Sequence, residues 1–192
     1  MFKKLYKQLY LLIFQPIKAW EVLADDREEE ITNNNSFLET YLYPIIGIAA
    51  ILAFIGVLFH KKEFDVQLAL KSTIRIIITL FAGFYLAALL LPKAMEHFLS
   101  IKSNNKLCQR FIGYSSALVY VTYMVLAIFP GFSFLSLIML YTVYIIWEGA
   151  MPYMQIPENQ RSKFTAIASI IILLSPFLIE QIMSLTMPGM RI

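Results

Sequence analysis

The chain contains very little cysteine and little charge, and each shortage excludes a class of protein. Cys108 is the single cysteine among 192 residues, so an intramolecular disulfide and a cysteine-based metal cage are both excluded. Charged residues make up 15% of the chain, whereas soluble domains contain about 25%. Hydrophobic residues make up 59%, which is more than a soluble protein of this size could bury. The composition therefore predicts an integral membrane protein.

Motifs for catalysis and cofactor binding are also missing. The chain has no G-x-S-x-G, no H-E-x-x-H and no phosphate-binding glycine loop. Its two histidines, His60 and His97, fall on opposite sides of the predicted membrane, so they cannot share a metal ion. The net charge of +3 is spread along the chain rather than gathered in a stripe, which argues against a nucleic-acid partner. We therefore expect no enzyme activity, no catalytic residue, no bound metal and no cofactor.

Five apolar segments predict an all-α, polytopic membrane helix bundle with five transmembrane helices. The segments cover about 42–59, 73–91, 111–129, 133–149 and 165–183. A helix needs about 20 residues to cross a hydrocarbon core about 30 Å thick, and the fourth segment is short of that length. Only Pro130, Gly131 and their neighbours join the third and fourth segments, which form either a tight hairpin of two crossings or a re-entrant pair in one leaflet. The transmembrane domain is assigned to residues 42–192.

Lys and Arg residues near the helix ends predict the orientation, because they accumulate on the cytoplasmic side. With the N-terminus inside, the inner side holds Lys3, Lys4, Lys7, Lys18, Arg27, Lys93, Lys102, Lys106, Arg110, Arg161 and Lys163. The outer side holds only Lys61, Lys62, Lys71 and Arg191. This imbalance predicts a cytoplasmic N-terminus and an outer C-terminus, with five crossings.

Residues 1–41 are predicted to form a cytoplasmic part with an amphipathic helix, an acidic run at 25–30 and a linker at 31–36. Apolar residues recur at helical spacing on one face of the helix: Phe2, Leu5, Leu9, Leu12 and Ile13. This pattern is typical of an interfacial helix that lies on a membrane, and Pro16 is expected to interrupt it. The candidate contacts with anionic lipid headgroups are Lys3, Lys4, Lys7, Lys18 and Trp20.

Three ionisable residues fall within the membrane segments, where a buried charge is costly. Arg75 and Glu180 lie near the outer ends of the second and fifth segments. Either they pair, or Arg75 extends to the outer headgroups while Glu180 faces water. Glu148 lies at the inner end of the fourth segment, where it is either an interfacial acid beside an inner cation or a proton or substrate relay. Its candidate partners are Lys93, Arg110 and Arg161.

Three stretches carry a resemblance to a known family. They are IFQPIKAWEVL at 13–23, RFIGYSSALVYV at 110–121 and YTVYIIWEGAMPYMQIPENQRSKF at 141–164. In their order and spacing they resemble the prokaryotic branch of the Yip family, the Ypt/Rab-GTPase-interacting membrane proteins. The third stretch is interpreted as a helix–loop–helix boundary, with Trp147 and Tyr153 at headgroup level and Gly149 ending the helix.

The resemblance to the prokaryotic branch implies a five-crossing fold in a bacterial inner membrane, and it names no catalytic residue. Eukaryotic members act in vesicle traffic and membrane shaping, so it implies a non-enzymatic scaffold or adaptor in membrane organisation. The chain lacks their aspartate-leucine-tyrosine-glycine-proline signature, which weakens the case for a Rab-type GTPase partner. The expected partners are anionic lipids, other membrane proteins and a second copy of the chain. The alternative is a small transporter or channel subunit that uses Glu148 or an Arg75–Glu180 pair.

Overall fold

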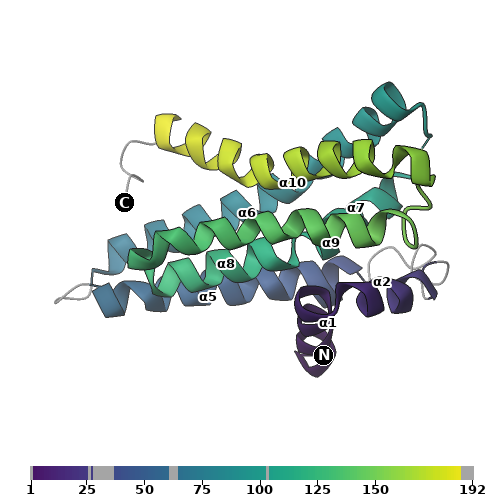
Figure 1. Cartoon of the computed structure of the whole chain (residues 1–192). Coiled ribbons are helices and arrows are strands. Elements are labelled where there is room, and N and C mark those ends of the chain that lie inside the picture. The colour runs from purple at the N-terminus through teal and green to yellow at the C-terminus, as the bar shows by residue number, and fades with distance from the viewer. Residues whose placement is uncertain (1, 26, 28–36, 61–64, 103, 187–192) are drawn as a thin grey trace.

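The computed structural model describes residues 2–25, 27, 37–60, 65–102 and 104–186. The N-terminal elements are the helices α1 (Phe2–Phe14) and α2 (Pro16–Asp25). The elements of the bundle are η1 (Leu38–Leu42), α5 (Tyr43–His60), α6 (Val66–Ala94), η2 (Met95–Leu99), α7 (Asn105–Ser115), α8 (Ala117–Ile128), η3 (Pro130–Tyr141), α9 (Thr142–Ala150) and α10 (Glu158–Thr186). No strand occurs among the described residues, and the long helices lie along one another (Figure 1). The predicted all-α helix bundle is therefore confirmed.

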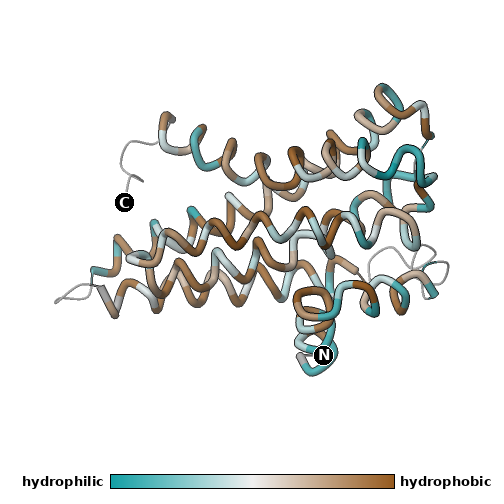
Figure 2. The backbone as a smooth tube through the Cα atoms, in the orientation of Figure 1, coloured by the Kyte–Doolittle hydropathy of each residue, from teal (hydrophilic) through white to brown (hydrophobic). Residues whose placement is uncertain are grey.

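The bundle has the lengths and the surface of a membrane protein. Among the described residues, four helical stretches are long and apolar enough to cross a membrane: Leu38–Val57, Val66–Leu99, Pro130–Ala150 and Glu158–Leu185. The pair α7 and α8 makes a fifth crossing if it is counted as one span. Hydrophobic residues follow the long helices in Figure 2, and many large apolar side chains on them are exposed, which suits a lipid environment. The protein is therefore an integral membrane protein.

The third apolar segment differs from the single helix that we expected over 111–129. α7 ends at Ser115 and α8 begins at Ala117, and the two helices are bent by 44° relative to each other. Ser116 between them has a ψ of 3°, outside the helical range. The bend therefore falls at the Ser115–Ser116 pair, and small residues such as serine are common at helix kinks.

The fourth apolar segment also departs from a regular α-helix. Its first part is the 3-10 stretch η3, which contains no buried residue and is kinked at Phe132 (φ −96°, ψ 38°). Only its second part, α9, is α-helical. A 3-10 helix rises about 2.0 Å per residue rather than 1.5 Å, so it spans more of the membrane with the same number of residues. The larger rise per residue compensates for the small number of residues in the fourth apolar segment. The span Pro130–Ala150 is the least buried of the four.

Glycines set the closest approaches between the long helices. A Cβ atom added to Gly56 in α5 would lie 2.0 Å from the carbonyl oxygen of Ala127 in α8. One added to Gly83 in α6 would lie 3.0 Å from the Cα atom of Pro176 in α10. Since helices in membranes gain most of their association energy from close packing, these glycines fix the α5–α8 and α6–α10 contacts.

The N-terminal helix α1 contacts the protein itself through the face that we expected to lie on lipid. Leu5 and Leu12 are 3% and 0% exposed, and α1 contacts α8. Packing on α8 removes these aliphatic side chains from water as well as a membrane would, and periodicity alone does not distinguish the two environments. Figure 1 shows α1 lying across the long helices rather than along them.

Parts of several predictions lie outside the described residues. These parts are Asp26 and Glu28–Glu30 of the acidic run, the linker at 31–36, and the outer-side residues Lys61, Lys62 and Arg191.

Candidate functional site

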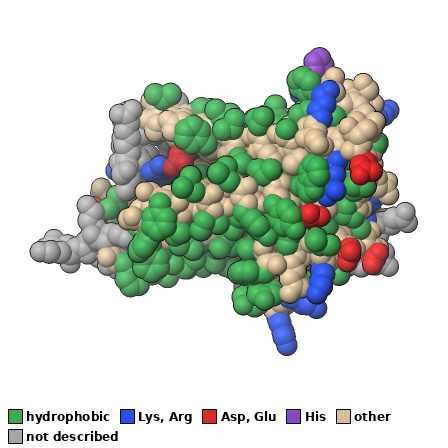
Figure 3. Space-filling view, viewed as in Figure 1, with side chains coloured by type: hydrophobic (Ala, Val, Ile, Leu, Met, Phe, Trp, Pro, Cys, Tyr) green, Lys and Arg blue, Asp and Glu red, His purple; other side chains and the backbone are tan. Residues whose placement is uncertain are grey.

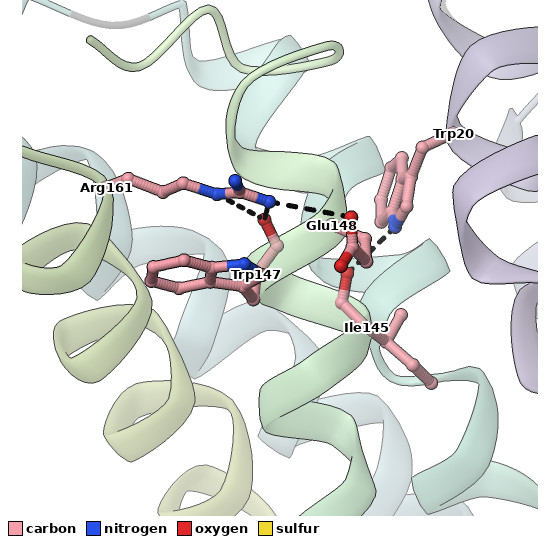
Figure 4. Close-up of polar contacts among 5 residues, drawn as sticks. All are labelled: Trp20, Ile145, Trp147, Glu148 and Arg161. Atoms are coloured by element: carbon pink, nitrogen blue, oxygen red, sulfur yellow. Dashed lines mark hydrogen bonds and ion pairs between the residues drawn. The ribbon is translucent and has the colours of Figure 1, made fainter. Parts of the chain in front are cut away.

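One end of the bundle brings together several of the residues that the sequence singled out, among them Trp20 and Glu148. It is formed by α2, α7, the end of α9 and the turn at 151–157, and we refer to it as the α2 end. Trp20 of α2 lies at its centre and is 0% exposed. The indole Nε1 donates a hydrogen bond to the Ile145 carbonyl oxygen at 2.8 Å (Figure 4). Its ring centroid lies 5.2 Å from those of Phe111 and Tyr153.

Trp20 is thus a buried anchor, and its predicted role as a lipid contact is wrong. The physical reason is that a tryptophan with one polar atom suits a membrane interface, but it suits a protein interior equally when the N–H finds an acceptor. Here the acceptor is a carbonyl group 125 residues away in the sequence.

Gly149 makes room for the Trp20 ring. A Cβ atom at this position would lie 2.4 Å from Cε2 of Trp20. We expected Gly149 to end its helix, but α9 continues to Ala150, so Gly149 serves as a close-approach residue. Tyr153 was expected at headgroup level and is instead 0% exposed, because its ring packs on Trp20.

Arg27, just beyond α2, adds a second attachment to the same turn. Its Nη1 atom donates to the Tyr153 carbonyl oxygen at 3.0 Å, and Nη2 donates to Oε1 of Gln155 at 3.3 Å. The N-terminal segment is therefore held to the turn at 151–157 by a buried aromatic contact and by a charged side chain.

Glu148 lies beside a cation at the end of α9. Nη2 of Arg161 is 3.5 Å from Oε2 of Glu148, so Arg161 is the candidate partner that the structure brings to it (Figure 4). Arg161 makes shorter contacts with Trp147, since Nε and Nη2 donate to the Trp147 carbonyl oxygen at 3.0 and 2.8 Å. The guanidinium carbon also lies 4.2 Å from the centroid of the Trp147 ring. Both charged side chains are about one-fifth exposed.

The last carbonyl groups of α9 have no partners within the helix, and the turn at 151–157 and Arg161 supply hydrogen-bond donors to them. The Gly149 carbonyl accepts from the backbone N–H groups of Tyr153 and Met154 at 3.2 and 3.3 Å, and the Ala150 carbonyl accepts from Ile156 at 3.0 Å. Arg161 satisfies the Trp147 carbonyl, and a cation is favourable at a helix C-terminus. Chemically, the arrangement caps α9, and Glu148 helps to position Arg161.

A second polar cluster joins α6, α8 and α10 within the membrane-spanning region. Arg75 and Glu180 form an ion pair, and the Tyr123 hydroxyl donates to Oε2 of Glu180 at 3.4 Å. Arg75 lies about 14 Å along α6 from Val66, at 1.5 Å per residue. The side chains of Arg75 and Glu180 are 28% and 26% exposed. Mutual neutralisation lowers the cost of placing both charges at this depth.

The remaining candidates lie apart from these clusters. The side chains of Lys3, Lys4, Lys7 and Lys18 are exposed on α1 and α2. Cys108 is buried, with Sγ 3.8 Å from Sδ of Met95. Within the part of the chain that the structure describes, no group of three His, Cys, Asp or Glu side chains could hold a metal ion.

A family model described as the Yip1 domain matches residues 10–179. The chain belongs to the Yip1 domain family. The family that three sequence stretches predicted is therefore confirmed. The matched region begins within α1, so this Yip1 domain takes in the Trp20 anchor as well as the Glu148–Arg161 contact. No curated protein and no solved structure matches the chain.

Sequence reasoning missed Tyr123 and Arg27 as members of these clusters. Tyr123 carries a usable signal, because it is a polar residue near the outer end of the third predicted crossing, at the depth of Arg75 and Glu180. Arg27 carries none, since a cation in an acidic run is ordinarily a solvated residue.

Proposed function

We propose that this Yip1-domain protein is a non-enzymatic scaffold or adaptor of a bacterial inner membrane, with its α2 end at the cytoplasmic face. The observation that carries the proposal is the Trp20 anchor. It fixes α2, and through α2 the helix α1, against the bundle while Lys3, Lys4, Lys7 and Lys18 remain exposed. A platform of this kind presents positive charge at a constant position relative to the crossing helices.

The four lysines suit the anionic inner leaflet. Each Lys near an anionic surface contributes about 1 kcal/mol, so four provide a useful but reversible attraction. Four ionisable residues form two separate ion pairs, Arg75–Glu180 and Glu148–Arg161, which suits structural roles. Partner membrane proteins, or a second copy of the chain, would bind along the crossing helices, and Pro130–Ala150 is the span least covered by its own protein.

The lipid part of the proposal is tested with the full chain in nanodiscs that contain spin-labelled anionic and zwitterionic lipids. We expect enrichment of the anionic label near the protein, and loss of that enrichment when Lys3, Lys4, Lys7 and Lys18 are all changed to Gln. High salt should have the same effect, because it screens exposed charges. Lys71→Gln, in α6, is the control. An enrichment that survives both the four substitutions and high salt would refute the electrostatic role.

A transporter or channel subunit is the second candidate, and the observation that favours it is the Arg75–Glu180–Tyr123 cluster inside the membrane. Flux of candidate ions and small solutes is measured in proteoliposomes with the wild type, Glu180→Gln and Glu148→Gln. The scaffold proposal predicts no flux that depends on either carboxylate. A flux abolished by either substitution in a correctly inserted protein would replace the scaffold with the transporter.

A further inference from the structure

An exposed aromatic stripe runs along α1 and is formed by Tyr6, Tyr10 and Phe14. These residues are spaced four apart, which places them on one face of a helix. Their exposed fractions are 71%, 45% and 68%. The rings contact one another, with centroids 6.5 Å apart for Tyr6 and Tyr10 and 5.0 Å apart for Tyr10 and Phe14. Since Leu5 and Leu12 are buried against the protein, α1 has two apolar faces, and its own bundle covers only the aliphatic one.

The position of α1 makes lipid the natural cover for the second face. α1 lies across the direction of the long helices, close to the α2 end, so its axis lies in the plane of a membrane that those helices cross (Figure 1). In Figure 3, hydrophobic side chains in the region of α1 lie beside the apolar surface of the long helices, and Lys or Arg side chains lie at its projecting end. Lys3 and Lys7 stand seven residues before Tyr10 and Phe14, so these two lysines share the helix face of the aromatic rings.

The side-chain chemistry points to the same environment. Tyrosine places an apolar ring at the acyl chains and its hydroxyl among the headgroups, and for this reason it is enriched at membrane interfaces. Lys3, Lys4 and Lys7 are exposed on the same helix, and lysine can lay its aliphatic stem along apolar surface while its ammonium group reaches anionic headgroups. Ile17, which is 51% exposed, extends the apolar surface into α2.

We propose that the aromatic stripe of α1 inserts into the headgroup–acyl boundary of the same membrane that the bundle crosses, at its α2 end. The proposal deepens the scaffold function and rests on it for the placement of α1 at the lipid surface. It differs in the force involved, because burial of Tyr6, Tyr10 and Phe14 requires no anionic lipid. α1 is then a two-faced helix, held between its own bundle on the aliphatic side and lipid on the aromatic side.

The test measures the depth of the stripe in the full chain. With Cys108→Ala as background, Tyr10→Cys and Phe14→Cys are each labelled with the fluorophore NBD, and Glu21→Cys on the exposed side of α2 is the matched control. The variants are reconstituted in neutral phosphatidylcholine vesicles that carry a shallow or a deep doxyl quencher. We expect the shallow quencher to remove most of the fluorescence at positions 10 and 14, the deep quencher to remove less, and position 21 to be little affected by either.

Two results would overturn the proposal. Quenching at positions 10 and 14 no stronger than at position 21 would place the stripe in water. A blue-shifted emission without lipid quenching would mean that protein covers it. Because the vesicles are neutral, this test does not depend on attraction between the lysines and anionic lipid. The two proposals can therefore fail separately. Quenching of the stripe together with an anionic-lipid enrichment that survives the four Lys→Gln changes would refute only the electrostatic role of the lysines. Monodisperse elution of each exposed-site variant in size-exclusion chromatography establishes that it is folded.

Discussion

Arg161 makes three kinds of contact at the α2 end, with a carbonyl oxygen, an aromatic ring and a carboxylate. It donates twice to the Trp147 carbonyl oxygen, lies over the Trp147 ring and contacts Glu148 at a longer distance. The planar guanidinium group is suited to this combination, because it has several donors in one plane and stacks on aromatic rings. The contact with the Glu148 carboxylate, at 3.5 Å, is longer than both hydrogen bonds to the Trp147 carbonyl oxygen and is therefore expected to contribute less.

Arg161→Lys is therefore expected to destabilise the protein more than Glu148→Gln. A lysine keeps the charge but loses the paired donors and the stacking, a loss of about 1.5–3 kcal/mol if it resembles other hydrogen bonds to charged groups. Glu148→Gln removes a partly exposed ion pair, which contributes about 1 kcal/mol or less. Thermal unfolding in mild detergent ranks the two variants. A larger loss for Glu148→Gln would show that the ion pair, not the capping contact, holds the end of α9.

Gly149→Ala tests whether the Trp20 ring needs the space of a missing side chain. The added Cβ atom would lie 2.4 Å from the ring, so Trp20 must shift, and overpacking of this kind costs about 1–3 kcal/mol. We expect the cost to fall in a Trp20→Leu background, because the smaller side chain leaves room. A double-mutant cycle on unfolding free energies measures this coupling. Additive effects of the two changes would contradict the contact.

The sequence alone identified several residues of the two clusters as unusual, but it did not predict what surrounds them. Arg75, Glu148 and Glu180 stand out because charges are rare in apolar runs, and each does lie in an ion pair. Trp20 was assigned to lipid because tryptophan suits interface and interior alike. Only the three-dimensional arrangement brings Gly149 and Ile145 to its ring.

At the scale of elements, hydrophobic length predicts the crossings better than it predicts their shape. The runs around 42–59, 73–91 and 165–183 correspond to the regular helices α5, α6 and α10. The bend at Ser116 was missed because the apolar run that begins at Phe111 continues through it without a proline. The change from η3 to α9 at Tyr141 was missed because the residues on both sides of it are similarly apolar. The contact of α1 with α8 could not be predicted, because the periodicity of apolar residues is the same for a helix that packs on protein and for one that lies on lipid.

The α5–α8 contact depends on one glycine and offers a matched control in the same helix. A Cβ atom at Gly56 would meet the backbone of Ala127, whereas one at Gly47 meets nothing within 4 Å. Gly56→Ala should cost roughly 1–3 kcal/mol or more, because backbone cannot move aside as a side chain can. Gly47→Ala should be neutral or stabilising, by up to about 1 kcal/mol, since alanine favours the helix. Unfolding temperatures in detergent compare the two, and equal effects would contradict the close approach.

For the whole molecule, the distribution of Lys and Arg residues is the basis for the predicted orientation of the bundle in the membrane. The exposed lysines of α1 and α2 lie toward the α2 end of the bundle. Lys163, whose Nζ donates to the Phe98 carbonyl oxygen at 2.6 Å, belongs to the same side in the predicted topology. The scaffold proposal and the membrane insertion of the aromatic stripe both place this end at the anionic cytoplasmic leaflet. If the bundle were inverted, the lysines would face the outer side and the proposal would lose its physical basis.

A topology assay with reporter fusions to the full chain measures this orientation directly. A fusion after Asn105, between η2 and the body of α7, should report the cytoplasm, and a fusion at Ile192 should report the outer side. Paired reporters, one active only inside and one active only outside, make each position its own control. We expect Asn105 inside and Ile192 outside; the opposite assignment, or both positions on one side, would refute the proposed orientation.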